Sequence, residues 1–191
     1  MNARPQEKNT MTPAEYLEME KTSLDIKHEF YDGEVFAMVG ARRNHNHINV
    51  NLAGELRSIF KADSSACRVF SNDMRVKVEK NYFYPDIVIY CGEPEFEDNE
   101  FDTLINPFVI MEILSDSTEA FDRGKKFKAY QQIPNLKEYI LVSQYEYSIE
   151  QFIRTQDIWQ YKLYDKKDQA LKIETVNCEL HLSEIYLNVE F

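Results

Sequence analysis

The chain has 191 residues and carries 33 acidic against 22 basic side chains, a formal net charge of −11. This balance excludes a uniformly basic face that would hold nucleic acid non-specifically, so any DNA contact must rest on a local patch. Because 43% of the residues are hydrophobic, we expect a single domain over residues 11–191, preceded by a flexible tail at residues 1–10.

The cysteines and the N-terminus bear on the cell compartment. Cys67, Cys91 and Cys178 are odd in number, far apart and without a CxxC spacing. This pattern predicts neither a disulfide framework nor a cysteine zinc site, and it favours the reducing cytoplasm. The first ten residues lack the apolar stretch of a signal peptide, and no later run has the length of a membrane span. We therefore expect a cytoplasmic protein without a membrane anchor.

The first half of the chain has the signals of a helix, a hairpin and a second helix. Residues 12–15, Thr-Pro-Ala-Glu, are typical of a capped helix start. Asp32-Gly33 suits the positive φ angles of a tight turn between two short strands. Apolar residues then recur at the spacing of one helical face: Ile48, Leu52, Leu56 and Ile59.

The second half has the signals of a buried mixed sheet. Apolar, β-branched runs at residues 86–90 and 108–114 are typical of buried strands, and strand character returns at residues 139–143 after a helix expected from about 119 to 132. This order predicts an α/β (α+β) fold with helices packed on a mixed sheet. The remainder reads as a β-meander and a short helix, at residues 148–153, 158–164, 170–176 and 182–185.

Glu112 is the most informative residue for function, because it lies within the apolar run Phe-Val-Ile-Met-Glu-Ile-Leu. Burying an unpaired charge costs several kcal/mol, so a bound cation or a cationic side chain is the natural compensation. Asp86 opens the preceding apolar run. If the two strands are neighbours, both carboxylates offer hard oxygen ligands to Mg²⁺. The alternative is a Glu112 paired with a lysine or exposed on an edge strand, and an Asp86 that belongs to a turn.

Three further polar residues share one helical face, because Asp122, Lys126 and Tyr130 are spaced four apart. Lys126 could place a positive charge beside the carboxylates, where it would orient water or stabilise charge on a phosphoryl group. The alternative is an ordinary surface ion pair between Asp122 and Lys126. Glu29, in the first hairpin, is another candidate carboxylate or an ordinary surface residue.

A local basic cluster precedes the long helix and could supply phosphate contacts. It consists of Arg42, Arg43, His45 and His47, and backbone N–H groups at a helix start also favour anions. His45 and His47 diverge on a helix, so they make a poor metal pair. Simple helix-start polarity explains the cluster equally well. Lys125 and Lys128 are further basic residues that could surround the acids.

Taken in this order, these residues resemble the Uma-two family of bacterial endonucleases, within the PD-(D/E)XK, restriction-endonuclease-like superfamily. The resemblance extends from about residue 11 to the end of the chain. The parts that carry it are His-Glu29-Phe-Tyr-Asp-Gly-Glu, the helix start around His45, Pro85-Asp86-Ile-Val-Ile, Met-Glu112-Ile-Leu-Ser, Asp122-Arg-Gly-Lys-Lys126, Tyr130, Lys-Glu-Tyr139 and the closing Glu-Leu-His-Leu-Ser-Glu-Ile-Tyr. It implies a restriction-endonuclease-like mixed central β-sheet flanked by helices, with a C-terminal β-meander.

The resemblance also implies roles for the site residues. The superfamily pattern has a lysine two residues after the second acid, where this chain has Leu114, and the family places that lysine on the following helix, at Lys126. Asp86 and Glu112 would then be ligands of Mg²⁺ or Mn²⁺, Glu29 a supporting acid, and Lys126 the group that polarises the attacking water or the phosphate. Asp122 and Tyr130 would hold Lys126, and Arg42, Arg43, His45 and Lys125 would contact nucleic acid.

The leading hypothesis is therefore a Mg²⁺-dependent endonuclease that hydrolyses DNA as a homodimer. A catalytically silent binding or assembly module on the same fold is the alternative from another class, and the net acidity favours it mildly. A metal-dependent hydrolase of a smaller phosphate ester needs no basic groove and is the third possibility.

Overall fold

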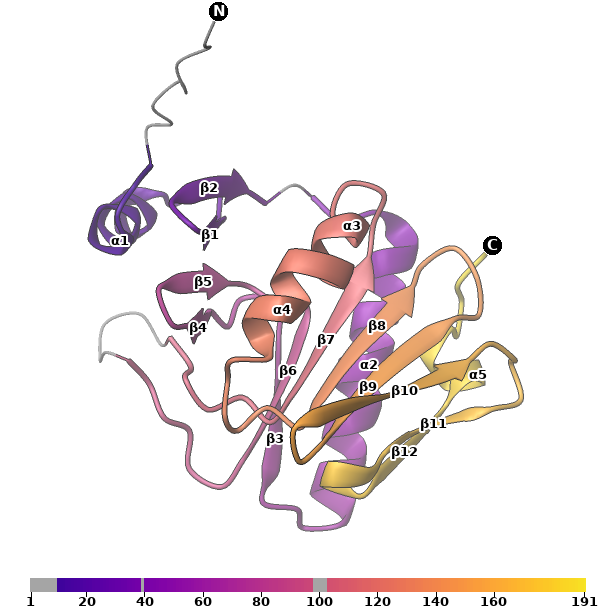
Figure 1. Cartoon of the computed structure of the whole chain (residues 1–191). Coiled ribbons are helices and arrows are strands. Elements are labelled where there is room, and N and C mark those ends of the chain that lie inside the picture. The colour runs from indigo at the N-terminus through magenta and orange to yellow at the C-terminus, as the bar shows by residue number, and fades with distance from the viewer. Residues whose placement is uncertain (1–9, 39, 98–102) are drawn as a thin grey trace, which may run out of the picture.

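The computed structural model describes residues 10–38, 40–97 and 103–191 of the chain. Within these residues, the main feature is a six-stranded sheet of order β10-β9-β8-β7-β6-β3 (Figure 1). Strands β7 and β8 run parallel, and every other neighbouring pair in this sheet is antiparallel. Its strands are β3 (Cys67–Ser71), β6 (Ile87–Cys91), β7 (Val109–Leu114), β8 (Glu138–Ser143), β9 (Ile149–Thr155) and β10 (Ile158–Tyr164).

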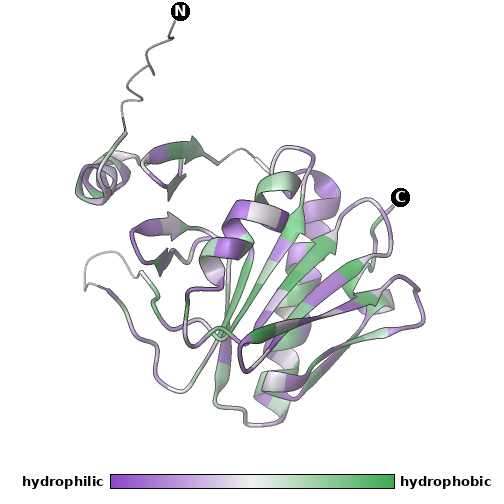
Figure 2. Ribbon diagram, in the orientation of Figure 1, coloured by the Kyte–Doolittle hydropathy of each residue, from purple (hydrophilic) through white to green (hydrophobic). Residues whose placement is uncertain are grey.

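Helices cover both faces of this sheet, which is why its central strands are buried throughout. One face packs against α2 (Arg43–Ala62), whose Ile48, Leu52 and Leu56 are fully buried, as the helical spacing predicts. The other face packs against a helical segment formed by α3 (Glu119–Phe121), the π-helical turn η1 (Asp122–Lys126) and α4 (Phe127–Tyr130). Figure 2 shows the apolar residues concentrated along the central strands between these layers. The predicted mixed sheet flanked by helices is confirmed.

A smaller sheet of order β2-β1-β5-β4 carries the first hairpin. Its strands are β1 (His28–Tyr31), β2 (Glu34–Ala37), β4 (Val76–Val78) and β5 (Asn81–Phe83). The predicted turn is confirmed, since Asp32 and Gly33 have φ angles of 49° and 85°. Phe30 packs with Tyr16 and Tyr82 on one face of the hairpin. Side chains alternate along a strand, so Glu29 lies on the other face.

The first and last elements of the described chain are short and are held by local contacts. Helix α1 (Pro13–Thr22) has the predicted capping box, in which Glu15 N donates to Thr12 Oγ1 at 3.3 Å and Thr12 N donates to Glu15 Oε2 at 2.7 Å. The last elements are β11 (Ala170–Ile173), the 3₁₀ turn η2 (Glu174–Val176), β12 (Cys178–His181) and α5 (Leu182–Ile185), and β11 pairs with β12.

The prediction that the cysteines form no disulfide was wrong. Cys67 and Cys91 are disulfide-bonded, and only Cys178 is free. Cys67 begins β3 and Cys91 ends β6, and these antiparallel strands place the two residues directly opposite each other. Cysteine spacing could not reveal this, because the pairing depends on the register of two strands.

Other expectations need correction in detail. The helix expected over residues 119–132 contains the π-turn and ends at Tyr130. The meander is made by β8, β9 and β10 at one edge of the main sheet, whereas the last predicted strand pairs with β12 instead. The predicted tail lies outside the described residues except for Thr10. No helix within the described residues has the length and apolarity required to cross a membrane.

Candidate active site

The centre of the candidate site is the buried ammonium of Lys126, which the π-turn η1 directs toward β7 and β1. Lys126 Nζ lies 2.8 Å from Glu29 Oε1, 2.9 Å from Glu112 Oε1 and 3.5 Å from Asp122 Oδ1. The Lys126 and Glu112 side chains are each 5% exposed. The structure thus brings together one lysine and three acids from a hairpin, a central strand and a helix.

Asp86 lies beside this cluster because β6 and β7 are antiparallel neighbours. Ile87 is paired with Met111, so the next residue on each strand places Asp86 opposite Glu112 on the same face of the sheet. Ile113 N donates to Asp86 Oδ2 at 2.7 Å, which fixes the carboxylate at the strand end. His45 Nε2 lies 3.1 Å from Asp86 Oδ1, and His45 Nδ1 is buried without a hydrogen-bond partner.

Aromatic side chains enclose the cluster. The Tyr130 hydroxyl donates to Glu112 Oε1 at 3.1 Å, and the Tyr139 hydroxyl donates to the backbone oxygen of Asp122 at 3.0 Å. The Lys126 ammonium also lies 5.7 Å from the centre of the Phe83 ring. Tyr130 therefore positions Glu112 directly.

The electrostatics of the cluster follow from burial and from an excess of acids. Burial raises the pKa of Glu112 well above its ordinary value; Lys126 opposes the shift, while Asp122, Asp86 and Glu29 add to it. Burial also raises the pKa of Asp122. Burial alone would lower the pKa of Lys126, but Glu112, Glu29 and Asp122 raise it well above its usual range. The acids therefore favour the charged form of the lysine, and they repel one another around it.

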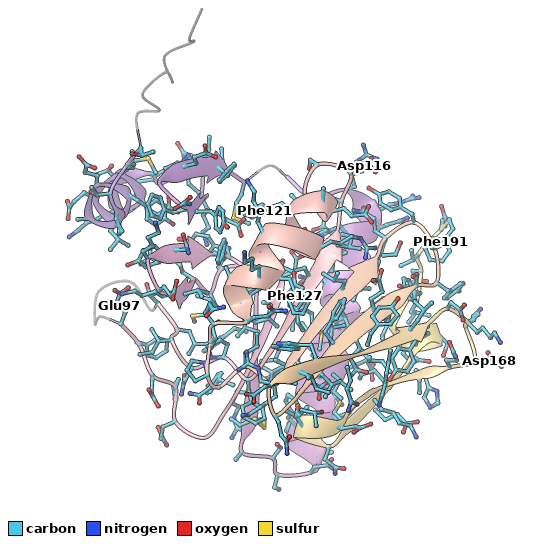
Figure 3. The ribbon with its side chains drawn as sticks, viewed as in Figure 1. Glu97, Asp116, Phe121, Phe127, Asp168 and Phe191 are labelled. Atoms are coloured by element: carbon cyan, nitrogen blue, oxygen red, sulfur yellow. A yellow bond between two sulfur atoms is a disulfide. The ribbon has the colours of Figure 1, made fainter. Side chains whose placement is uncertain are left out.

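A π-turn carries Lys126, and its neighbours in the chain show why it faces inward. Phe121 and Phe127, labelled in Figure 3, flank the turn and pack against aromatic rings of the hairpin and of β8 and β9 respectively. Apolar contacts therefore anchor the segment at both ends. The wider π-turn between them buries Asp122 and Lys126 together. Such turns occur frequently at functional sites.

The residues that were predicted to contact nucleic acid lie in different environments. Arg42 is paired with Asp116 at 3.6 Å and Arg43 with Glu190 at 2.7 Å, and both arginines are largely exposed. Lys125 is exposed, with its ammonium 5.8 Å from the centre of the Tyr31 ring. His45 lies inside the site against Asp86. The two arginines thus have acidic partners, whereas His45 contacts an acid of the site itself.

Sequence reasoning missed Asn49, which supports the backbone at Asp86. Asn49 is buried on α2, and its amide donates to the Asp86 backbone oxygen at 3.2 Å and to Asn72 Oδ1 at 2.9 Å. The Ser71 hydroxyl donates to Asn49 Oδ1 at 2.6 Å. His45 and Asn49 are four residues apart on a helix otherwise buried through apolar residues, and that spacing was a signal of a polar function.

The donor chemistry of the site suits a divalent cation. Asp86 and Glu112 supply hard carboxylate oxygens, and Glu29, Asp86, Glu112 and Asp122 outnumber the single ammonium of Lys126. Over the described ranges, no three His, Cys, Asp or Glu side chains are arranged around a common point that could hold a metal ion. Lys126 is the group that compensates the acids in this arrangement.

Comparison with known proteins identifies the family. Residues 13–189 match the model of the Uma2 family, described as "Putative restriction endonuclease". The chain belongs to the Uma2 family. Two Synechocystis proteins of the strain PCC 6803 are similar to it. "Uncharacterized protein sll1609" is 37% identical over 77% of this chain and 82% of its own length, and "Uncharacterized protein slr1290" is 31% identical over 95% and 94%.

A solved structure supports the fold independently. The crystal structure of "a putative nuclease belonging to DUF820" from Anabaena variabilis superposes with a TM-score of 0.76, covering 92% of this chain and 97% of that one. The two chains share 16% sequence identity. At that level the likeness establishes a shared fold, and the nuclease description belongs to the Anabaena protein. For this Uma2 chain, the family and the fold together indicate a restriction-endonuclease-like nuclease.

Proposed function

We propose that this Uma2 protein is a Mg²⁺- or Mn²⁺-dependent endonuclease that hydrolyses phosphodiester bonds of DNA. The observation that carries the proposal is the buried ammonium of Lys126 between Glu29 and Glu112, with Asp86 beside them on the adjacent strand. A lysine beside two strand carboxylates combines a fixed positive charge with hard oxygen ligands. Both features stabilise the charge that develops in phosphodiester hydrolysis.

Each residue has a definite task in this proposal. Asp86 and Glu112 would hold the cation, which supplies a more acidic water and neutralises the departing oxyanion. Ile113 N and His45 orient Asp86, and Tyr130 orients Glu112. These contacts keep the two carboxylates side by side.

Lys126 would act directly on the phosphate or the attacking water. An ammonium has three N–H donors, and the contacts with Glu29 and Glu112 use two of them. The distance of 3.5 Å to Asp122 is longer than a good hydrogen bond. One donor is therefore available to a substrate oxygen, and Glu29 and Asp122 hold the ammonium in place.

Supercoiled plasmid is the direct test. Incubation with Mg²⁺ or Mn²⁺ should convert it to nicked or linear DNA, and chelation of the metal should stop the reaction. Glu112→Ala should be inactive, whereas Asp168→Ala, at an exposed position far from the cluster (Figure 3), should cut at the wild-type rate. Equal cutting by Glu112→Ala would contradict the proposal.

A second candidate is a hydrolase of a smaller phosphate ester. The pairing of Arg42 with Asp116 and of Arg43 with Glu190 favours it, because these arginines are then less available to a DNA backbone. Turnover of bis(p-nitrophenyl) phosphate without plasmid cutting would select this alternative. Binding of DNA without turnover of either substrate would select the catalytically silent module.

The remaining parts of the proposal concern the whole molecule. We propose that residues 11–191 act as one domain and that two copies associate, because cutting both DNA strands takes two sites; light scattering would measure the oligomer. We also propose a cytoplasmic location, where the protein would meet a DNA substrate; the cysteine argument for that location failed with the Cys67–Cys91 bond.

A further inference from the structure

The face of the hairpin β1–β2 that carries Glu29 also carries exposed apolar side chains. Glu29 is paired with Phe36, so both side chains lie on the same face of the hairpin, and opposed residues of an antiparallel pair have Cβ atoms about 5 Å apart. Met38 N donates to Lys27 O at 2.8 Å, which continues this pairing beyond the strand ends. Phe36 and Met38 are 40% and 38% exposed. Two apolar side chains thus lie partly open next to an acid of the site.

Phe36 is held by a second aromatic ring, which belongs to the helical segment that carries Lys126. The ring centres of Phe36 and Phe121 are 5.7 Å apart, and Tyr31 packs edge-on against Phe121 at 5.5 Å. Figure 3 labels Phe121 where this segment approaches the hairpin. Phe121 directly precedes Asp122, which contacts Lys126. The exposed ring is therefore joined to the site twice, through Glu29 across the hairpin and through Asp122 along the chain.

Phe36 and Met38 differ from other exposed apolar residues in their position beside an acid of the site. Single exposed apolar side chains are normal on a protein surface, and Tyr161 on β10 is one, with 53% exposure. Phe36 differs because its strand partner binds the Lys126 ammonium. When the phosphate of a substrate reaches Lys126, the chemical group next to that phosphate lies beside the face of the hairpin that carries Glu29 and Phe36.

The charge of the protein favours an apolar contact there. The net charge is −11, and Arg42 and Arg43 are each paired with an acid. Attraction of the DNA backbone to a basic surface is therefore weak, and binding needs another source. Every nucleobase has a π-face, so an aromatic side chain can hold an unpaired base of any sequence.

We propose that Phe36, supported by Phe121 and flanked by Met38, stacks on an unpaired nucleobase next to the phosphate that is cut. This inference rests on the proposed nuclease function and specifies its substrate. A base inside a duplex is already stacked on its neighbours and does not present its face. The protein should therefore prefer single-stranded or locally unpaired DNA to intact duplex.

Binding and cleavage test the inference separately. The probe for binding is a short single-stranded oligonucleotide containing 2-aminopurine, with Ca²⁺ as the cation, and the same sequence as a duplex is the comparison. Phe36→Ala should bind the single strand about tenfold more weakly, equivalent to about 1.4 kcal/mol, and should lose quenching of 2-aminopurine. In cleavage, it should raise KM with little change in kcat.

Matched variants distinguish stacking from general packing. Phe36→Trp should restore binding and quenching, whereas Phe36→Leu, which retains apolar volume without a π-face, should behave as Phe36→Ala. Tyr161→Ala should match wild type. Equal affinity of Phe36→Ala and wild type for the single strand, or equal behaviour of Phe36→Leu and Phe36→Trp, would overturn the inference.

The outcome also separates this inference from the proposed function. A wild-type protein that binds and quenches the single strand through Phe36 but cuts no DNA supports the stacking contact and contradicts the nuclease. A protein that cuts plasmid equally well with Phe36→Ala, with unchanged KM, supports the nuclease and overturns the stacking contact. A protein that neither binds the single strand nor cuts plasmid overturns both.

Discussion

Two buried carboxylates on neighbouring strands of the main sheet have opposite electrostatic surroundings. Glu112 on β7 and Glu138 on β8 are both almost fully buried, at 4% and 0% exposure. Side-chain alternation directs them to opposite faces of the sheet. Glu112 shares its side with Ile110 and Leu114, whereas Glu138 shares its side with Ile140 and Val142 against the α2 layer.

Neutral donors surround Glu138. Thr175 N and the Thr175 hydroxyl donate to Glu138 Oε1 at 2.9 and 2.7 Å, and Gln151 Nε2 donates to Glu138 Oε2. Gln151 also donates to Lys172 O at 2.7 Å and accepts from the Tyr164 hydroxyl at 2.9 Å. This network fastens the C-terminal elements to the sheet, and every contact in it stabilises the folded chain.

Glu112 lies instead among like charges. Its Oε1 accepts from Lys126 and Tyr130, but Asp86, Asp122 and Glu29 raise its pKa further, in addition to burial. A structure selected for stability alone would not gather acids around one ammonium. The comparison teaches that two equally buried carboxylates differ in what surrounds them: neutral donors hold Glu138, whereas like charges crowd Glu112, and clustered acids of that kind are typical of functional sites.

The largest expected effect separates the two carboxylates by activity. Glu112→Gln should lower phosphodiester cleavage by about 1,000-fold or more, because it removes a cation ligand. Glu138→Gln should retain the wild-type rate per folded molecule. Initial rates on plasmid at saturating metal would measure both. If the two variants lost activity equally, the distinction between the carboxylates would fail.

The next effect tests whether Lys126 acts through its buried position in the site or only through its positive charge. Lys126→Met should lower the cleavage rate by about 100-fold to 1,000-fold, the usual loss for one donor to a developing charge. Lys125→Met and Lys128→Met should change it less than about threefold, because both lysines are exposed. Similar losses in all three would point to general attraction of the DNA backbone, and each variant would then show a shallower salt dependence than the wild type.

Metal binding should stabilise only the repelling cluster. A divalent ion at about a hundred times its Kd adds roughly 2.7 kcal/mol to the free energy of unfolding. Asp86→Asn and Glu112→Gln should melt no lower than metal-free wild type, since each removes a repelling charge, but they should lose most of the metal response. Calorimetry with and without Mg²⁺ would measure this. Glu138→Gln and Asp168→Asn should keep the full response, and its loss there would weaken the assignment of the ligands.

The smallest expected effect is the stability cost at Glu138. Glu138→Gln places an amide N–H₂ against donors that need an acceptor, so the free energy of unfolding should fall by about 1 to 3 kcal/mol. Urea unfolding monitored through the single tryptophan, Trp159 on β10, would measure the loss. An unchanged urea midpoint would mean that the hydrogen bonds around Glu138 do not stabilise the attachment of the C-terminal elements to the sheet.

Much of the fold was predictable because it depends on local patterns. The apolar runs of β6, β7 and β8, the spacing on α2 and the Asp32-Gly33 turn are each legible within a few residues. The short strands β5 and β12 were not predicted, because three or four residues carry little periodicity and their pairing depends on distant partners. The Cys67–Cys91 bond was missed for the same reason.

The candidate site was predictable in its members and less so in its contacts. Glu112 stood out as a charge within an apolar strand, and Lys126 through its spacing from Asp122. The contact of His45 with Asp86 required knowledge that the start of α2 reaches the start of β6. Arg42 and Arg43 were chosen for their charge, but their acidic partners are distant in sequence.

The π-turn that carries Lys126 has a consequence for insertions and deletions. Each residue of an α-helix advances the side-chain direction by about 100°, and a π-turn holds one residue more than the α-helical turn it replaces. Phe121 on one side and Phe127 on the other are both seated in aromatic contacts. Shortening the segment by one residue would turn either Lys126 or one of these rings away from its place. Relatives that keep this site should therefore vary in the identity of the exposed residues of the turn, such as Gly124, and not in their number.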